Sequence, residues 1–315
     1  MAPDAGSGRS RRKTAATLLI ALLVAVCTAC TGTPGHRRDD GPLQPLFSIA
    51  GARLIARMDS AGGATFDAIG QYVPLVFPVA VAASLNDIYI ADAGASRLYR
   101  YDRTLDAMAV LPETRINAST RLQAGADGSV YVLDTFSSEI RRYSRGGQLL
   151  PGLHPRLVTS RYSSFTLDPA TGKAYVVDSA HLVIDEIQPL GQFSVDLQRL
   201  DEAGPIATNG QALFVANSRC GCIVEWLRGR PGRIFGAGQL HQPLSIAVAG
   251  LQLYAIDGAT RSIALVHEEG VDSLAAAPLG LLMPETLATA NGMLLVADGA
   301  GHRVVAFRPR TKLPQ

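Results

Sequence analysis

Apolar and polar residues alternate in short runs along most of the chain, and turn-forming residues separate the runs. Residues 88–91, for example, read IYIA and are followed by Asp92, after which small and polar residues lead into a further apolar stretch. Alternation with a period of two, over runs this short, predicts β-strands with one buried face. We therefore expect an all-β chain made of short strands and tight turns.

The strand pattern recurs six times, and an acidic or amide residue marks the end of the second strand in each copy. Successive markers lie roughly forty residues apart, a spacing typical of β-propeller blades. Each copy holds a first strand, a turn with Asn or Gly, a second strand, a third strand and a weaker fourth strand. The markers are Asp92, Asp134, Asp178, Asn217, Asp257 and Asp298. The pattern predicts a six-bladed β-propeller of four-stranded antiparallel blades.

The last copy has three strands, which end at residue 307, so its fourth strand must come from elsewhere. We expect an N-terminal strand at residues 64–69 to close the ring, because this segment lies just ahead of Pro78, the proline that starts the first copy. Residues 52–58 are then left over, either as an extra outer strand or as the remnant of a seventh blade. The propeller domain is placed at residues 47–315.

A proline, or the residue in its place, precedes the marker by fourteen positions in every copy, although Ala203 stands there in the fourth copy. The first strand of a propeller blade lines the central channel, so the next residue in each copy is expected to face that channel. These residues are Val79, Arg121, Phe165, Gly204, Leu244 and Glu285. Two of them are charged, with opposite signs.

The proline, the hairpin, the marker and the following arginine together resemble the NHL-repeat family of propellers. The resemblance covers residues 64–307. It departs at Asn217, which replaces the aspartate, and at 173–187, which lacks the small loop and the arginine. The family implies the propeller fold but no particular ligand, because one fold serves many functions.

The N-terminal residues have the pattern of a bacterial signal peptide. Basic residues at 9–13 precede an apolar run at 15–29, which is shorter than the roughly 20 residues that span a bilayer. The run ends at Cys30 in a sequence that resembles a lipobox. We expect a signal peptide at 1–29 and a lipidated tether at 30–46; ordinary secretion and an uncleaved anchor are alternatives. Thr31 follows the cysteine, and by resemblance to proteobacterial lipoproteins this favours the periplasmic face of the outer membrane.

The nearly balanced charge of the chain argues against nucleic acid as a partner. Lys and Arg number 29 against 27 Asp and Glu, for a formal net charge of +2, so no strongly basic face for nucleic acid is expected. With 47% hydrophobic residues in 315, the chain has enough apolar material for one large domain. The expected partners are the membrane, through the N-terminal lipid, and a protein or a small polar ligand.

The repeated markers are interpreted as structural. A carboxylate at a strand end can accept hydrogen bonds from the amides of the following turn, and one such residue per blade indicates an architectural role. The charged channel residues Arg121 and Glu285 allow two readings. They form a water-bridged pair that stabilises the axis, or they bind a small polar ligand at the channel mouth.

Loops that open on the same face as the first-strand starts carry further candidates. Arg97, His181, His241 and His302 are expected to surround the recognition face, together with the loop of Cys220 and Cys222. The two cysteines allow a strained disulfide, free thiols or a metal site, and two cysteines are a minimal metal-binding set. We predict no metal ligands and no cofactor, with a central divalent cation as an open alternative.

Catalytic propellers provide a test of enzymatic function. Peptide-amidating lyases, which the repeats resemble, hold zinc through histidines directly after the blade prolines, and those places carry Val79, Leu244 and Glu285 here. Gluconolactonase-like propellers use inward Glu, Asn and Asp, of which Glu285 alone is evident. We therefore predict a binding or scaffold module without catalytic residues. A metal-dependent hydrolase or lyase and a structural part of an envelope assembly are the alternatives.

Overall fold

Short antiparallel sheets build the described part of the chain, which in this computed structural model covers residues 41–66, 69–113, 115–188, 198–227 and 229–310. Pro42–Gln315 is one compact unit, distinct from Met1–Gly41. The predicted signal peptide, the lipidation site Cys30 and tether residues 30–40 lie outside the described residues. Within the described ranges, no helix is long and apolar enough to cross a membrane.

Five sheets have four strands each, as predicted for the blades. The second sheet holds β9 (Arg121–Ala124), β10 (Val130–Asp134), β11 (Glu139–Tyr143) and β12 (Leu149–Leu153). The third holds β13 (Tyr162–Leu167), β14 (Ala174–Asp178), β15 (Val183–Ile187) and β16 (Gln198–Arg199). The fourth holds β17 (Ile206–Thr208), β18 (Leu213–Asn217), β19 (Cys222–Leu227) and β20 (Arg230–Phe235). The fifth holds β21 (Pro243–Ala249), β22 (Gln252–Asp257), β23 (Ser262–Val266) and β24 (Val271–Ala275).

The sixth sheet combines both ends of the described chain. It holds β25 (Pro284–Ala290), β26 (Met293–Asp298), β27 (Arg303–Pro309) and β1 (Leu43–Ile49). The short helix η1 (Ala277–Leu279) precedes it, after β24.

The first sheet departs from the predicted four strands because it has seven. Its regular part is β5 (Pro78–Ala83), β6 (Asp87–Asp92), β7 (Arg97–Asp102) and β8 (Ala107–Leu111). Outside β8 lies β2 (Gly51–Met58), which runs parallel to it, and β2 also pairs with β3 (Ala64–Thr65) and β4 (Tyr72–Pro74). Five of the six sheets thus have the four strands predicted for a blade, and the first sheet does not. Segment 52–58, for which two roles were considered, is an extra outer strand of this first sheet.

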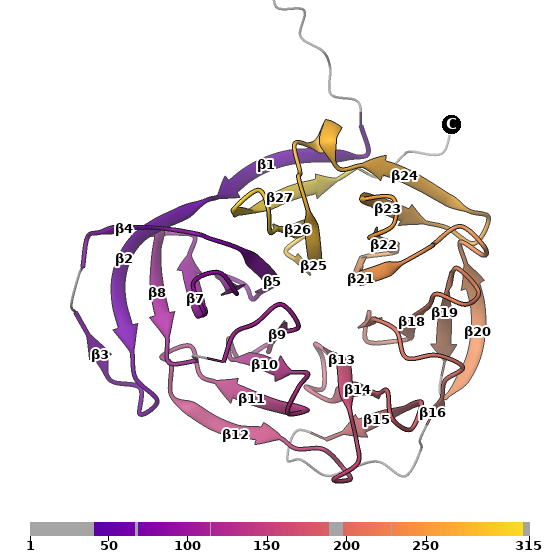
Figure 1. The fold of residues 1–315 in the computed structure, drawn as a ribbon, viewed down its shortest axis with the longest axis horizontal. Helices are drawn as coiled ribbons and strands as arrows, with labels where there is room; N and C mark the ends of the chain where they lie inside the picture. Colours follow the sequence, from indigo (N-terminus) through magenta and orange to yellow (C-terminus); the bar gives the residue numbers. More distant parts are fainter. Residues whose placement is uncertain (1–40, 67–68, 114, 189–197, 228, 311–315) are drawn as a thin grey trace, which may run out of the picture. The chain divides into compact units, whose positions relative to one another are not determined.

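The innermost strands form a closed ring. Each of β5, β9, β13, β17, β21 and β25 contacts the next, and β25 contacts β5 (Figure 1). The apolar core lies between neighbouring sheets. Ile90 and Tyr99 of the first sheet, for example, pack with Leu295 and Val304 of the sixth, and all four side chains are fully buried. The described chain is therefore an all-β propeller with essentially no helix.

An N-terminal strand closes the ring, as predicted, but the expected segment was wrong. Strand β1 pairs with β27 from Leu43 opposite Pro309 to Ile49 opposite Val304. Of the expected segment 64–69, residues 64 and 65 form β3 at the first sheet instead, and residues 67 and 68 lie outside the described residues. Strand β1 begins within the predicted tether. Pro45 argues against a strand in this segment, because proline has no backbone N–H to donate. Strand β1 lies at the edge of its sheet, where the N–H groups on the outer side need no partner strand, so proline is tolerated there.

Hairpin length sets which residues face the channel. Ala83 pairs with Ile88 in the first sheet, but the corresponding pairs are Ala124 with Val130 and Leu167 with Ala174, so the second and third hairpins are longer by one and two residues. Residues at a constant distance from the marker are therefore not equivalent. The equivalent residues, each opposite the residue just before the marker, are Ala80, Arg121, Ser164, Pro205, Ser245 and Thr286.

Of the six predicted channel residues, Arg121 alone stands at an equivalent position. The prediction was wrong for Val79, Leu244 and Glu285, which lie one residue before that position in the bulge of their strands. Val79 and Phe165 are buried between sheets, each 2% exposed, because Val79 lies in a bulge and Phe165 lies one step past the channel position. Phe165 is nevertheless one of the residues that line the channel cavity. A Cβ at Gly204 would overlap the backbone of Ala216, so this position serves a close approach to β18.

Candidate binding site at the channel axis

The markers fasten the loops around the channel mouth. Asp92 accepts hydrogen bonds from the amides of Val76 (2.7 Å) and Phe77 (2.8 Å), which lead into β5, and from Ala95 in the following turn (3.0 Å). Asp257 and Asp298 hold the loops before β21 and β25 in the same way. The structural interpretation of the markers is confirmed.

Two markers show how burial and hydrogen bonding compete. Burial would raise the pKa of Asp178 and Asp257, because a carboxylate loses its water. The hydrogen bonds that each accepts outweigh burial and hold both pKa values below the usual range. These carboxylates are therefore ionised at neutral pH and act as acceptors, and they are not poised as proton donors.

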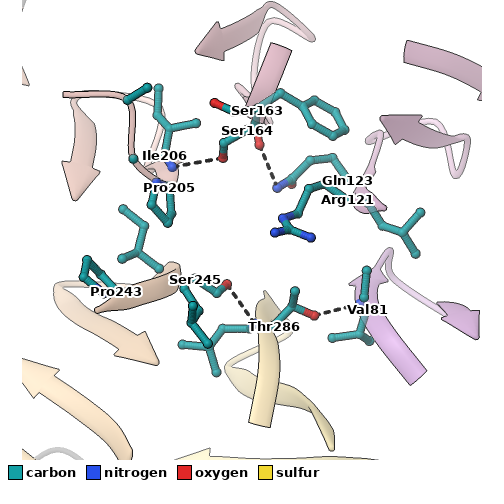
Figure 2. A pocket seen from close by; sticks show the side chains of 18 residues that line it. Val81, Arg121, Gln123, Ser163, Ser164, Pro205, Ile206, Pro243, Ser245 and Thr286 are labelled. Atoms are coloured by element: carbon teal, nitrogen blue, oxygen red, sulfur yellow. Dashed lines mark hydrogen bonds between the residues drawn. The ribbon is translucent and has the colours of Figure 1, made fainter. Parts of the chain in front are cut away.

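A cavity of about 230 Å³ opens where the inner strands begin (Figure 2). All six inner strands contribute to its wall. A second hollow of about 590 Å³ lies toward the hairpin turns, and it shares Gln123, Ile246 and Leu287 with the first. The ring of inner strands thus encloses space along its axis.

Hydroxyl groups in the wall join neighbouring sheets. Thr286 Oγ1 accepts the Val81 amide at 3.2 Å, and Ser245 Oγ accepts the Leu287 amide at 3.0 Å. Ser164 Oγ accepts the Ile206 amide at 3.2 Å (Figure 2). Each hydroxyl stands at the channel position of one sheet and binds the next sheet, so the three bonds form a recurrent inter-sheet link.

The other three channel positions carry Ala80, Arg121 and Pro205, none of which can accept a hydrogen bond through its side chain. In the three links, the bound amide belongs to the residue that follows the channel position of the next sheet. The corresponding amides for Ala80, Arg121 and Pro205 are those of Leu122, Phe165 and Ile246. Among the described residues, no side chain accepts from these three amides. The wall is therefore rich in donors at three of its six steps.

Arg121, at the start of β9, reaches into the middle of the cavity (Figure 2). Its Nη1 donates to the neighbouring Thr120 carbonyl at 3.1 Å. Burial lowers the pKa of Arg121, and the charge of Glu285 opposes that effect. Burial likewise raises the pKa of Glu285 against the attraction of Arg121. The charges of these two predicted residues thus act on each other, but Glu285 is not among the residues that line the cavity, and no ion pair within 4.0 Å joins the two.

The remaining predicted site residues are not brought together at the cavity. His181 Nδ1 lies 2.7 Å from its own marker Asp178, and its Nε2 lies 3.2 Å from Thr159 Oγ1. His241 Nδ1 lies 3.3 Å from Asp257. His302 hydrogen-bonds the Val76 carbonyl, and Arg97 lies opposite Asp92 in the register of β6 and β7. The three histidine side chains support the loops around the mouth.

The cysteine loop contains the disulfide that was one of three alternatives. Cys220 and Cys222 are bonded, with Cα atoms 5.2 Å apart. In the described part of the chain, no group of three or more His, Cys, Asp or Glu side chains is placed to hold a metal ion.

Sequence reasoning missed the hydroxyl links. Ser245 and Thr286 stand two residues after the prolines Pro243 and Pro284, a recurrence that could have been noticed. Ser164 was hidden because the longer hairpin of the third sheet moves it to the place assigned to the proline equivalent.

No protein-family model matches the chain, and no curated protein matches it. Several solved structures are similar to it. A protein of unknown function from Bacteroides thetaiotaomicron has a TM-score of 0.61 and 13% identity, covering 83% of this chain and 76% of its own. Virginiamycin B lyase from Staphylococcus aureus has a TM-score of 0.54 and 15% identity, with 75% and 86% covered. Nidogen, from a complex with laminin, has a TM-score of 0.52 and 17% identity, with 67% and 85% covered.

These neighbours are β-propellers, and at such identities the likeness shows the fold alone. They include both a lyase and a propeller in a complex with another protein, so the fold does not choose between catalysis and binding.

Proposed function

We propose that this protein is an extracytoplasmic, lipid-anchored propeller of the NHL type that binds a small polar ligand in its channel cavity. The observation that carries the proposal is the guanidinium of Arg121, which extends into the cavity and, among the described residues, has no carboxylate partner within 4.0 Å. A buried charge is costly unless a partner compensates it, and a bound ligand would supply that partner. In this proposal the seven-stranded first sheet counts as the sixth blade.

The lipobox-like sequence supports the proposed location. Acylation of Cys30 would attach the chain to a membrane, and two or more acyl chains make such attachment stable. Thr31 favours the periplasmic face of the outer membrane, as in the proteobacterial lipoproteins that this segment resembles. The disulfide between Cys220 and Cys222 suits an oxidising compartment.

Binding is favoured over catalysis by the state of the titratable groups. His181 and His241 each hydrogen-bond a buried marker carboxylate, and neither lines the cavity. Among the described residues that line the cavity, the charged side chain is that of Arg121, and an arginine is a poor proton donor or acceptor because it stays charged. Recognition needs only that this side chain and the hydroxyls fit a ligand.

The test is a thermal-shift screen of the full chain in mild detergent, against small neutral, cationic and anionic molecules. Each molecule that raises the unfolding midpoint is tested again on Ser245→Trp, in which the indole fills the cavity. We expect the shift to disappear in this variant. Thr104→Trp, which adds the same side chain at an exposed turn, is the matched control and should keep the shift.

Loss of the Ser245 hydroxyl removes a link to Leu287, so Ser245→Trp is first compared with Ser245→Ala, which loses the link but leaves the cavity open. Binding that survives in Ser245→Ala and fails in Ser245→Trp locates the ligand at the axis. Shifts that persist in Ser245→Trp, or a screen in which no molecule binds, would contradict the proposal.

A further inference from the structure

We infer that the cavity selects a small oxyanion, a molecule with a carboxylate or phosphate group, which Arg121 holds with the help of donors from the inner strands. This inference rests on the proposed function, because it names the ligand class of the same cavity. It depends on which hydrogen-bonding groups the wall presents.

Arg121 occupies a position where other sheets carry a hydrogen-bond acceptor. At the equivalent position of three sheets, a hydroxyl accepts an amide from the next sheet. In the second sheet this position holds a guanidinium, which can only donate, and a hydroxyl there would have bound the Phe165 amide. The Phe165 carbonyl accepts Gln123 Nε2 of the second sheet at 3.3 Å, so this part of β13 does face β9. The side chain of Arg121 therefore offers no acceptor to that amide, and it extends into the cavity instead.

The hydroxyl groups of the wall still have protons to donate. Ser164, Ser245 and Thr286 each use an oxygen lone pair to accept an amide, and each keeps its own proton to donate. No acceptor for these protons is recorded among the described residues. Together with the guanidinium, they place side-chain donors from four of the sheets around one cavity. An oxyanion offers several acceptor sites on one small group, and a planar guanidinium binds carboxylate or phosphate through two parallel bonds.

The negative charge of Glu285 should limit the affinity of the cavity for an anion. Its charge interacts with Arg121 but the two groups make no ion pair within 4.0 Å, so Glu285 does not occupy the guanidinium. A bound anion would be repelled by the Glu285 carboxylate. Removing that charge should strengthen anion binding, the opposite of what a cationic or zwitterionic ligand would show.

The experiment is titration calorimetry of the full chain in detergent, at constant ionic strength set with chloride. The probes are lactate, inorganic phosphate, the neutral isostere lactamide and the cation methylammonium. We expect lactate or phosphate to bind and the other two not to bind. Arg121→Gln should weaken anion binding at least about tenfold, since it removes charge-assisted hydrogen bonds. Glu285→Gln should strengthen it by about three- to tenfold.

Arg121→Lys keeps the charge without the planar fork, so it should bind anions with intermediate affinity and serves if Arg121→Gln does not fold. The relative affinities of lactate and phosphate identify which oxyanion the cavity prefers. Anion binding that persists in Ser245→Trp would be a general salt effect and would overturn the inference.

Other outcomes separate the two proposals. If lactamide or methylammonium binds the cavity as tightly as lactate, or if Arg121→Gln keeps the full anion affinity, the oxyanion inference fails while the proposed small-ligand site stands. If no probe and no molecule of the wider screen responds to Ser245→Trp, both fail.

Discussion

At the scale of single residues, a hydroxyl in one inner strand bonds to an amide in the next, and this link is made three times around the channel. Thr286 is 6% exposed, so water cannot easily replace its oxygen as the acceptor for Val81. Removing the acceptor destabilises the protein by more than the hydrogen bond contributes to folding, because the buried amide is then left without water and without a partner.

We therefore predict that Thr286→Val, which keeps the shape but loses the acceptor, lowers the free energy of unfolding by about 1–3 kcal/mol. Thr286→Ser keeps the oxygen and is the matched control. Its loss should be smaller, since it removes one methyl group and no hydrogen bond. Urea unfolding followed by circular dichroism measures both; equal losses in the two variants would show that packing, and not the acceptor, matters at this position.

Residue types at the site were predictable only in part. Arg121 and Glu285 were found because opposite charges are unusual beside a narrow channel. The hydroxyl links were not, since serine and threonine are common and their partners are amides of another sheet, 42 residues away in two links and 205 in the third. No local pattern reveals such partners. The aspartate markers were correctly interpreted because their partners include the adjacent turn.

At the scale of elements, hairpin length and strand partners decide what each residue does. The six repeats follow from the alternation of apolar residues, so strand order within each blade was predictable. Because the turn between β13 and β14 has two more residues than that of the first sheet, Ser164 takes the channel position and Phe165 lies one step past it, in the core. A repeat aligned by distance from its marker conceals such insertions.

The closing strand β1 joins two cores, which makes its apolar residues important. Leu43 packs with the core between the fifth and sixth sheets, and Ile49 packs with the core between the sixth and first. Both are 2% exposed. We predict that Leu43→Ala lowers the free energy of unfolding by about 2–5 kcal/mol, as for other large-to-small changes in cores.

The control for this variant is Ser48→Ala, on the same strand but exposed, which should change stability by less than about 0.5 kcal/mol. Denaturant midpoints of the two variants, compared with the unchanged chain, test the prediction. A Leu43→Ala protein as stable as the Ser48→Ala protein would mean that β1 does not close the ring in solution.

At the scale of the whole molecule, the N-terminal sequence predicts where the propeller works. We expect Cys30→Ser to release the protein from membranes in cell fractionation, because the change removes the acylated side chain. Cys27→Ser, three residues earlier, leaves the acylation site intact and should stay in the membrane fraction. The lipobox interpretation fails if the Cys30→Ser protein remains membrane-bound with an uncut N-terminus, or if both variants are released alike.

The pairing of β1 with β27 also governs how the chain can be made. A chain emerges from the ribosome with its N-terminal end first, so β1 appears long before β27, and all the intervening strands are synthesised while β1 has no partner. Long-range pairings of this kind form slowly, and an unpaired strand edge invites association with other chains. Pro45 interrupts the donors of β1, and the pairing shifts between Pro45 and Phe47. The irregularity that obscured this strand in the sequence thus makes the unpaired β1 a poorer template for pairing with other chains.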